Sequence, residues 1–471
     1  MKKTIIAITA LFVSMTLFAE RVSQEDAALV ANTFMNPAAT NSSLKKAAPA
    51  KRMVLKQSAS TEQPQYYIYE NANGEGWVII AASDAVTPIL AYSETGHFRT
   101  DNMPTNLKNW MSQYNTFIQR VEADGSEASE EAKAQWEEVR NGVRRAQNAT
   151  AIVGPLVKSK WDQGAPYWNL CPYNATVGRA YTGCVATAMA QVMNYWKWPV
   201  KGTGSHSYRS LDPNNPEKYS KYYTKTLSAN FGATTYDWAN TLDEYTDEDG
   251  EELPGITEAQ KNAVATLMYH CGVSAEMMYG SDSENGSGTY TINYGVWDDP
   301  MSAENAFFTY FGYKRSTLRS YARDGYTDQG VKYYDPWEDA DWIAMLKEEL
   351  DKKHPIMYDG AGKTAYDGGH SFICDGYDSR NYFHFNWGWS GYGDGFFALS
   401  NLKPGGGGAG GGSYDFSYDQ CVIIGIEPDS KPSAMEQVAS EMPQAGKTIE
   451  NGQLVIIRNN EKYSVLGHKI Q

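Results

Sequence analysis

A cysteine and a histidine in this 471-residue chain have neighbours typical of a nucleophile and its general base. Apolar residues recur with a helical period after Cys184 and continue to Trp196, which predicts a core helix. Thr182 and Gly183 should supply a capping hydroxyl and a flexible entry to this helix. Cys184 then lies in the first turn, where unpaired N–H groups and the helix dipole favour a thiolate. Most free cysteines are merely buried small side chains, so this stretch alone does not establish catalysis.

His370 is the residue best placed to act as the general base. It follows Gly368 and Gly369 at the start of a strand predicted over 370–377. Small residues there let a substrate chain approach, so both glycines are candidate substrate-binding residues. A histidine on a strand is more often structural than catalytic, and support must therefore come from its neighbours.

A second predicted strand follows the first after a short turn. In such a hairpin the start of the first strand lies beside the end of the second, which brings His370 close to the segment 386–389. Asn386 is expected to orient the imidazole, while Trp387 and Trp389 shield that bond and line the substrate site. The alternative interpretation is an aromatic corner that only packs the sheet.

Gln163 is the candidate for stabilising negative charge on the attacked carbonyl oxygen. It lies on a predicted loop upstream of the nucleophile, and its side-chain amide can act together with the backbone N–H of Cys184. Such oxyanion donors are a large contributor to acyl-transfer catalysis. Together with His370 and Asn386, these residues form the set that acyl transfer by a cysteine requires.

The composition argues against several other classes of protein. A net charge of −15 disfavours a nucleic-acid partner bound through a basic face. The five cysteines have no spacing typical of a zinc site and are odd in number, so neither a metal nor a disulfide framework is expected. The acidic stretch 243–252 lacks the ligand pattern of a calcium loop, and no cofactor is expected elsewhere.

The chain divides into four predicted segments. Residues 1–19 have a basic start and a short apolar run, typical of a secretory signal peptide and too short to span a membrane. Residues 20–150 form a small α/β unit that ends in a charged linker, and residues 151–428 form an α+β domain with two halves. Residues 429–471 form a linker and a small β tail. We expect a monomer that acts outside the cytoplasm.

Local patterns predict most elements of these segments. In the first unit they indicate a helix capped by Ser23, a hairpin with its turn at 71–74, a strand over 85–92 and a helix over 106–121, with a low-order stretch after the first helix. In the second unit they indicate helices over 259–271 and 303–311, and strands over 355–359, 382–387, 395–398 and 421–426.

These blocks of sequence resemble the streptopain family of cysteine peptidases. The resemblance rests on 162–167, 183–191, 368–372, 386–389, 394–397 and 422–428, and on 76–93 in the first unit. The blocks occur in the family's order and cover almost all of residues 22–428. The resemblance implies a papain-like fold with a helical lobe and an antiparallel β lobe, preceded by an inhibitory prosegment.

The resemblance also implies endopeptidase activity on proteins or peptides, with a hydrophobic side chain favoured at the second subsite. It assigns the nucleophile to Cys184, the base to His370 and the oxyanion glutamine to Gln163. The family is often described as a Cys–His dyad, so Asn386 rests on the hairpin argument. The extra length between residues 201 and 341, compared with papain, leaves the subsite walls unassigned.

A secreted zymogen is the further implication, with residues 20–150 as an intramolecular inhibitor. The tail from 448 to 471 resembles the C-terminal sorting signals of exported Bacteroidetes proteins, which implies export to the cell surface or beyond. Two alternatives remain open. A transglutaminase or amidase would use the same Cys–His pair on another acyl acceptor or substrate, and a non-catalytic adhesin would keep only the fold.

Overall fold

The computed structural model combines helices and antiparallel strands, so the predicted α+β class is confirmed. It divides into two compact units, each built from segments distant in sequence. Unit 1 comprises Met1–Leu156, Thr246–Glu251 and Tyr321–Val422, and unit 2 comprises Val157–Tyr245, Glu252–Ser320 and Ile423–Gln471. The described residues are 20–36, 51–58, 63–100, 103, 105–125, 128–142, 152–284, 286–293, 300–328, 331–361, 369–399, 418–429, 446–450, 453–458, 461–464 and 469–470. The predicted signal peptide lies outside them.

A ten-stranded sheet lies mainly in unit 1, in the order β1-β2-β3-β4-β17-β16-β15-β14-β18-β11. The strands are β1 (Met53–Ser58), β2 (Tyr66–Asn71), β3 (Trp77–Ala81), β4 (Ile89–Ser93), β11 (Arg319–Ala322), β14 (Ile356–Ala361), β15 (Gly369–Tyr377), β16 (Tyr382–Asn386), β17 (Gly395–Ala398) and β18 (Tyr418–Ile424). The first four come from the N-terminal segment and pair with the later strands through β4 and β17. A smaller pair, β12 (Asp324–Asp328) and β13 (Val331–Pro336), lies outside this sheet.

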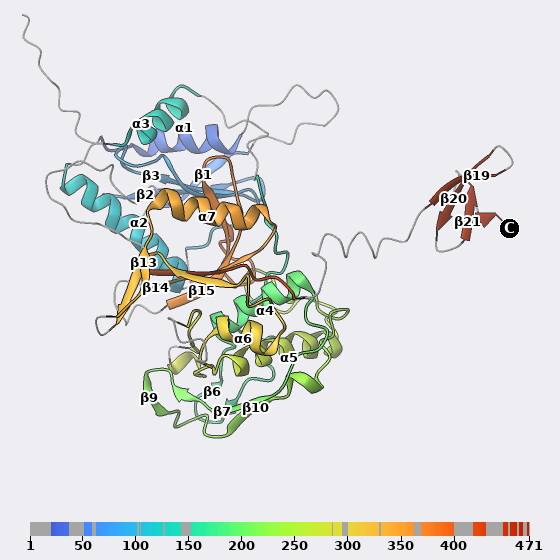
Figure 1. The fold of residues 1–471 in the computed structure, drawn as a ribbon. Helices are drawn as coiled ribbons and strands as arrows, with labels where there is room; N and C mark the ends of the chain where they lie inside the picture. Colours follow the sequence, from blue (N-terminus) through green and yellow to red (C-terminus); the bar gives the residue numbers. More distant parts are fainter. Residues whose placement is uncertain are drawn as a thin grey trace, which may run out of the picture. The chain divides into compact units, whose positions relative to one another are not determined.

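Four helices belong to unit 1: α1 (Gln24–Met35), α2 (Thr105–Ala123), α3 (Glu130–Arg140) and α7 (Asp339–Asp351). Ser23 caps α1 as predicted, since its side chain accepts a hydrogen bond from the backbone N–H of Asp26 at 3.1 Å. α1 packs on β1, β2 and β3 and beside α3 (Figure 1), and α7 packs on β14 and β15. The large sheet is therefore covered by helices from both the N-terminal and the later part of the chain.

Unit 2 contains the helices α4 (Cys184–Trp196), α5 (Glu258–Ser274) and α6 (Ala303–Tyr310), with short 3-10 turns at Phe231–Ala233 and Asp282–Glu284. α5 packs against both α4 and α6. A capping box at Thr257 and Gln260 starts α5. Short strands surround these helices: β5 (Tyr173–Asn174), β6 (Gly178–Arg179), β7 (His206–Arg209), β8 (Leu211–Asp212), β9 (Asn215–Tyr219) and β10 (Thr226–Ala229).

Two predictions for the N-terminal segment are wrong in detail. The stretch expected to have low order contains β1, which pairs with β2 and has an irregularity between Leu55 and Gln57. Pairing with β2 stabilises β1, whose own sequence has no alternating pattern that would predict a strand. The strand predicted from residue 85 begins only at Ile89, because Pro88 has no N–H to add to a ladder.

The C-terminal tail forms a separate four-stranded antiparallel sheet. Its strands are β19 (Gly446–Glu450), β20 (Gln453–Arg458), β21 (Glu461–Ser464) and β22 (Lys469–Ile470). The small β tail expected from the sequence is therefore present, with four strands.

Candidate active site

Cys184 begins α4, as the sequence predicts. Gly183 is the N-cap residue at φ 87°, a left-handed conformation that favours glycine, and it offers no side-chain cap to the helix. Cys184 is half-buried, whereas almost all other residues of α4 are buried. The cysteine therefore lies at the positive end of a core helix without a competing cap, a setting that favours a thiolate.

The prediction that Thr182 caps α4 is wrong. Its Oγ1 lies 3.1 Å from Oγ1 of Thr187, whose hydroxyl also donates to the carbonyl of Gly183 at 3.1 Å. The backbone N–H of Thr182 donates to the carbonyl of Gln163 at 3.2 Å. Because Gly183 itself occupies the N-cap, Thr182 lies one residue too early to cap. It instead joins the loop of Gln163, a buried residue, to the start of α4.

Gln191 links α4 to an upstream segment, a contact that was not predicted from the sequence. Its side chain is fully buried on α4, and its Oε1 accepts hydrogen bonds from Oγ of Ser159 at 3.0 Å and from the backbone N–H of Trp161 at 3.4 Å. A buried amide requires partners, so an isolated glutamine in an apolar helix was the available signal. Gln191 ties the segment leading to Gln163 to the helix that begins at Cys184.

His370 lies on β15 in unit 1, opposite Gly360 of β14. The side chain is only 7% exposed, and its ring is stacked with Phe372 and with Trp389 at centroid distances of 6.1 and 5.6 Å. Nε2 of His370 lies 2.9 Å from the carbonyl oxygen of Trp387. The start of β15 and the residues after β16 therefore do lie at the same end of the hairpin.

The carbonyl of Trp387 fixes the tautomer of His370. A carbonyl oxygen can only accept, so Nε2 must carry the proton and donate it, and Nδ1 keeps the lone pair that a general base needs. Burial lowers the pKa of His370 to about 4, and the bond to Trp387 opposes this effect. The imidazole is consequently neutral near pH 7 in this structure, the form in which it can accept a proton.

The other histidines of the region from 152 to 399 each have a side-chain partner. The pairs are His206 with Glu276 at 2.8 Å, His270 with the hydroxyl of Tyr236 at 3.0 Å, His354 with Glu349 at 2.8 Å, and His384 with Asp375 at 2.6 Å. His354 is half-buried. In contrast, the hydrogen bond described for His370 is to a backbone carbonyl, so that bond involves no ionisable partner.

The remaining predicted site residues lie around His370 in unit 1. Oδ1 of Asn386 accepts a hydrogen bond from the backbone N–H of Gly388 at 3.1 Å. Trp387 is buried, and its ring N–H donates to a backbone carbonyl, whereas Trp389 is half-buried. Gly369 is exposed at the start of β15, and Gly368 lies outside the described residues. Cys184 and Gln163 belong to unit 2, so the two groups come from different compact units.

Thiol reactivity gives a first test of Cys184. Burial raises the pKa of Cys171 to about 12, and burial also raises the pKa values of Cys271 and Cys374. Cys421 is buried as well, which leaves Cys184 as the half-buried thiol. We expect iodoacetamide to modify one thiol of the folded, activated protein rapidly, and peptide mapping should locate it at residue 184. Two equally fast thiols would contradict the helix-terminus explanation.

The two neutral, buried histidines predict how stability depends on pH. Burial lowers the pKa values of His270 and His370 from 6.5 to about 4, so unfolding takes up protons between these values. The free energy of unfolding should therefore fall as the pH drops from about 6.5 to 4, by up to about 1.4 kcal/mol per pH unit for each group. Urea unfolding of an inactive Cys184→Ala precursor at several pH values measures this free energy. A His270→Gln variant should show a shallower fall, and an unchanged slope would contradict the prediction.

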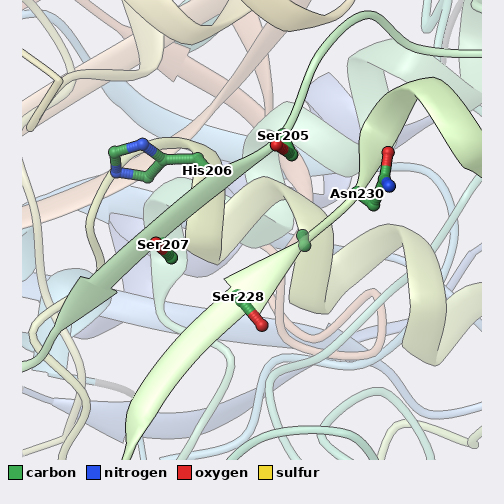
Figure 2. A pocket seen from close by; sticks show the side chains of 6 residues that line it. Ser205, His206, Ser207, Ser228 and Asn230 are labelled. Atoms are coloured by element: carbon green, nitrogen blue, oxygen red, sulfur yellow. The ribbon is translucent and has the colours of Figure 1, made fainter.

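A polar hollow of about 480 Å³ lies elsewhere in unit 2, on β7 and β10 (Figure 2). It is lined by Ser205, His206, Ser207, Ser228, Ala229 and Asn230, and by none of the predicted catalytic residues. Within the described residues, no group of three or more His, Cys, Asp or Glu side chains could hold a metal ion. No described helix is long and apolar enough to cross a membrane.

Comparison with known protein families gives two matches. The Peptidase C10 family matches residues 161–397, which include Cys184, His370 and Gln163. A family described as Spi protease inhibitor matches residues 19–118, most of the N-terminal segment.

Individual proteins give the same result. The chain is 31% identical over 381 residues to the thiol protease/hemagglutinin PrtT of Porphyromonas gingivalis, covering 79% of this chain and 38% of the relative. It is 32% identical over 376 residues to streptopain of Streptococcus pyogenes, covering 77% of this chain and 80% of the relative. A solved fragment of prointerpain A from Prevotella intermedia matches with a TM-score of 0.57 and 32% identity, over 81% of this chain and all of the fragment.

Proposed function

Since the chain belongs to the Peptidase C10 family of cysteine peptidases and carries a propeptide inhibitor domain, we propose that it is a secreted endopeptidase that uses Cys184 and His370. The observation that carries the catalytic assignment is the bond from Nε2 of His370 to the carbonyl of Trp387, because it leaves Nδ1 as a base. The proposal requires Cys184 and His370 to meet in the active enzyme, in a papain-like arrangement of a helical and a β lobe.

The proposed reaction proceeds through an acyl-enzyme. Nδ1 of His370 takes the proton from Sγ of Cys184, and the thiolate attacks the peptide carbonyl carbon. The oxygen that becomes negative is stabilised by the backbone N–H of Cys184 and the side-chain amide of Gln163. The C–N bond breaks as His370 gives its proton to the leaving amine. A water that His370 then deprotonates attacks the thioester and releases the acid and the free thiol.

Asn386, Trp387 and Trp389 have supporting roles in this proposal. The carbonyl of Trp387 orients the imidazole, and the half-buried ring of Trp389 stacks on it and can shield the site from water. Asn386 stabilises the loop after β16 by accepting the bond from Gly388. Gly368 and Gly369 are assigned to the substrate's path because residue 369 is exposed beside His370.

The N-terminal segment, residues 20–150, is proposed to inhibit the peptidase in the precursor. Within unit 1 it continues the sheet of the later domain, since Tyr92 and Ala91 of β4 stand opposite Phe396 and Phe397 of β17. The hydroxyl of Tyr92 also donates to the buried carboxylate of Asp378 at 2.8 Å. This continuous sheet supports a docked prosegment, because a linker or spacer would need no such pairing.

Activation is proposed to require a cut before residue 152. The backbone of Ile152 and of Val153 donates to the carbonyl of Tyr377, and Leu156 donates to Asp375, so this segment is paired with β15. We therefore expect the cut between Arg140 and Gly154, and within that window after α3, in the stretch 143–151, which lies outside the described residues. Secretion by the signal peptide, a monomeric mature enzyme and removal of the C-terminal tail complete the proposal.

A digestion assay tests the function against its two rivals. The activated protein should degrade casein, and an epoxide-type thiol-protease inhibitor should stop that degradation. A transglutaminase would instead couple a labelled amine to casein without releasing new peptide ends. An adhesin would do neither, and its binding to surfaces would be indifferent to the epoxide.

A further inference from the structure

The segment directly before the nucleophile is held from two sides within unit 2. On one side the carbonyl oxygen of Gln163 accepts a hydrogen bond from the backbone N–H of Thr182, as described above. On the other side the backbone N–H of Tyr181 donates to the carbonyl of Gly280 at 3.1 Å. The side chain of Ser287 completes this second contact, since its hydroxyl lies 2.8 Å from the carbonyl oxygen of Tyr181.

The hydroxyl of Ser287 lies between the backbone of Tyr181 and the backbone of Gly280. Its Oγ accepts the N–H of Gly280 at 2.9 Å and lies 3.1 Å from the carbonyl of the same residue. A reciprocal pair of backbone bonds between Met278 and Gly288, at 2.9 and 3.1 Å, closes the loop that carries it. The serine hydroxyl is therefore held by a closed loop, within hydrogen-bond distance of the carbonyl oxygens of both Tyr181 and Gly280.

The packing around Gly183 shows how closely this loop approaches the helix start. A Cβ built on Gly183 would lie 2.6 Å from Sδ of Met277 and 3.3 Å from Cβ of Ser287. The loop thus bonds the chain at Tyr181 and leaves no room for a side chain at residue 183. A shift of the loop would move the backbone immediately before Cys184.

We propose that Ser287 is a positioning residue that, through Tyr181, sets the place of the Cys184 backbone N–H in the oxyanion site. This inference rests on the proposed function, in which that N–H acts together with the amide of Gln163. Ser287 does not touch the reacting atoms in this proposal. Its hydroxyl fixes the backbone at Tyr181, while the loop of Gln163 binds the next residue, Thr182. Together these contacts keep the distance between the backbone N–H of Cys184 and the side-chain amide of Gln163.

The test is steady-state kinetics of activated Ser287→Ala with a peptide substrate. We expect kcat to fall about tenfold, the size of one lost hydrogen bond, while KM stays within twofold. Ser287→Thr keeps the hydroxyl and should restore most of kcat. Ser283→Ala removes an exposed hydroxyl from the same loop and should leave kcat unchanged.

Two further measurements separate positioning from other roles. The rate of Cys184 alkylation by iodoacetamide and its pH profile should be unchanged in Ser287→Ala, because the helix start and His370 set the thiolate. In a Gln163→Ala background, the effect of Ser287→Ala on kcat should shrink below threefold, since one oxyanion donor is already gone.

Three results would overturn the inference. An unchanged kcat in Ser287→Ala would show that the hydroxyl positions nothing, and a rise in KM alone would make it a wall of the substrate site. If the rate of Cys184 alkylation fell together with kcat, the substitution would act on the Cys184 thiolate and not on the oxyanion site. The proposed function fails separately, if the unsubstituted activated protein does not cleave the peptide.

Discussion

Replacing Cys184 by alanine is expected to abolish peptide hydrolysis, with activity falling to the level of the uncatalysed assay. The thiolate forms the covalent bond to the substrate in the proposed reaction, and no neighbouring side chain can replace it. Alanine is a good helix former and Cys184 is half-buried in the first turn, so the precursor should remain folded. Fluorogenic-peptide hydrolysis and thermal unfolding measure the two effects.

The control for this substitution is Cys421→Ala, which removes a buried sulfur from β18. It should keep peptidase activity and lose only modest stability. The Cys184→Ala precursor should also remain uncleaved if activation is autocatalytic, and be trimmed normally if another protease acts. Full proteolysis by the Cys184→Ala protein would contradict the assignment of the nucleophile.

The separated segment 20–150, added to the activated enzyme, is expected to inhibit it stoichiometrically. Trp110 is the side chain that should contribute most, because its ring packs on Phe385, Trp387 and Phe397 at centroid distances of 5.3, 5.7 and 6.1 Å. One of these neighbours, Trp387, supplies the carbonyl that holds His370. Trp110→Ala should weaken inhibition by about 100-fold, the effect of losing a buried interface tryptophan.

Lys108→Ala is the matched control for the prosegment, since Lys108 is exposed on the same helix, α2. It should inhibit as well as the unsubstituted segment. Inhibition constants from titration of the activated enzyme compare the variants. If the full-length precursor already hydrolyses peptides as fast as the trimmed form, the segment is not an inhibitor, and a chaperone or targeting role would replace the zymogen explanation.

Local sequence signals predicted the elements that carry the proposed catalytic residues. The helical period after Cys184 gave α4, and the turn sequence after β15 placed His370 beside residues 387–389. These predictions succeed because side-chain period and turn chemistry act over a few residues. The same reasoning produced the correct cap of α1 at Ser23.

Long-range pairing and backbone partners could not be predicted in this way. The pairing of β4 with β17 joins strands about 300 residues apart, and neither strand's sequence predicts which strand it will pair with. The acceptor for His370 is the carbonyl of Trp387, and every residue carries a carbonyl, so residue type pointed to Asn386 instead. The cap expected from Thr182 failed for a similar reason, since the conformation of Gly183 decided which residue began the helix.

Labelling the activated enzyme with an epoxide-type inhibitor, followed by peptide mapping, tests the central claim that Cys184 and His370 perform the hydrolysis. The account predicts one inhibitor per chain, located on Cys184, with the labelled fraction equal to the fraction of activity lost. His370→Ala should lose hydrolysis and label much more slowly, because the imidazole no longer removes the thiol proton. Complete loss of activity with the label on any other residue, or labelling and hydrolysis at normal rates in His370→Ala, would contradict the account.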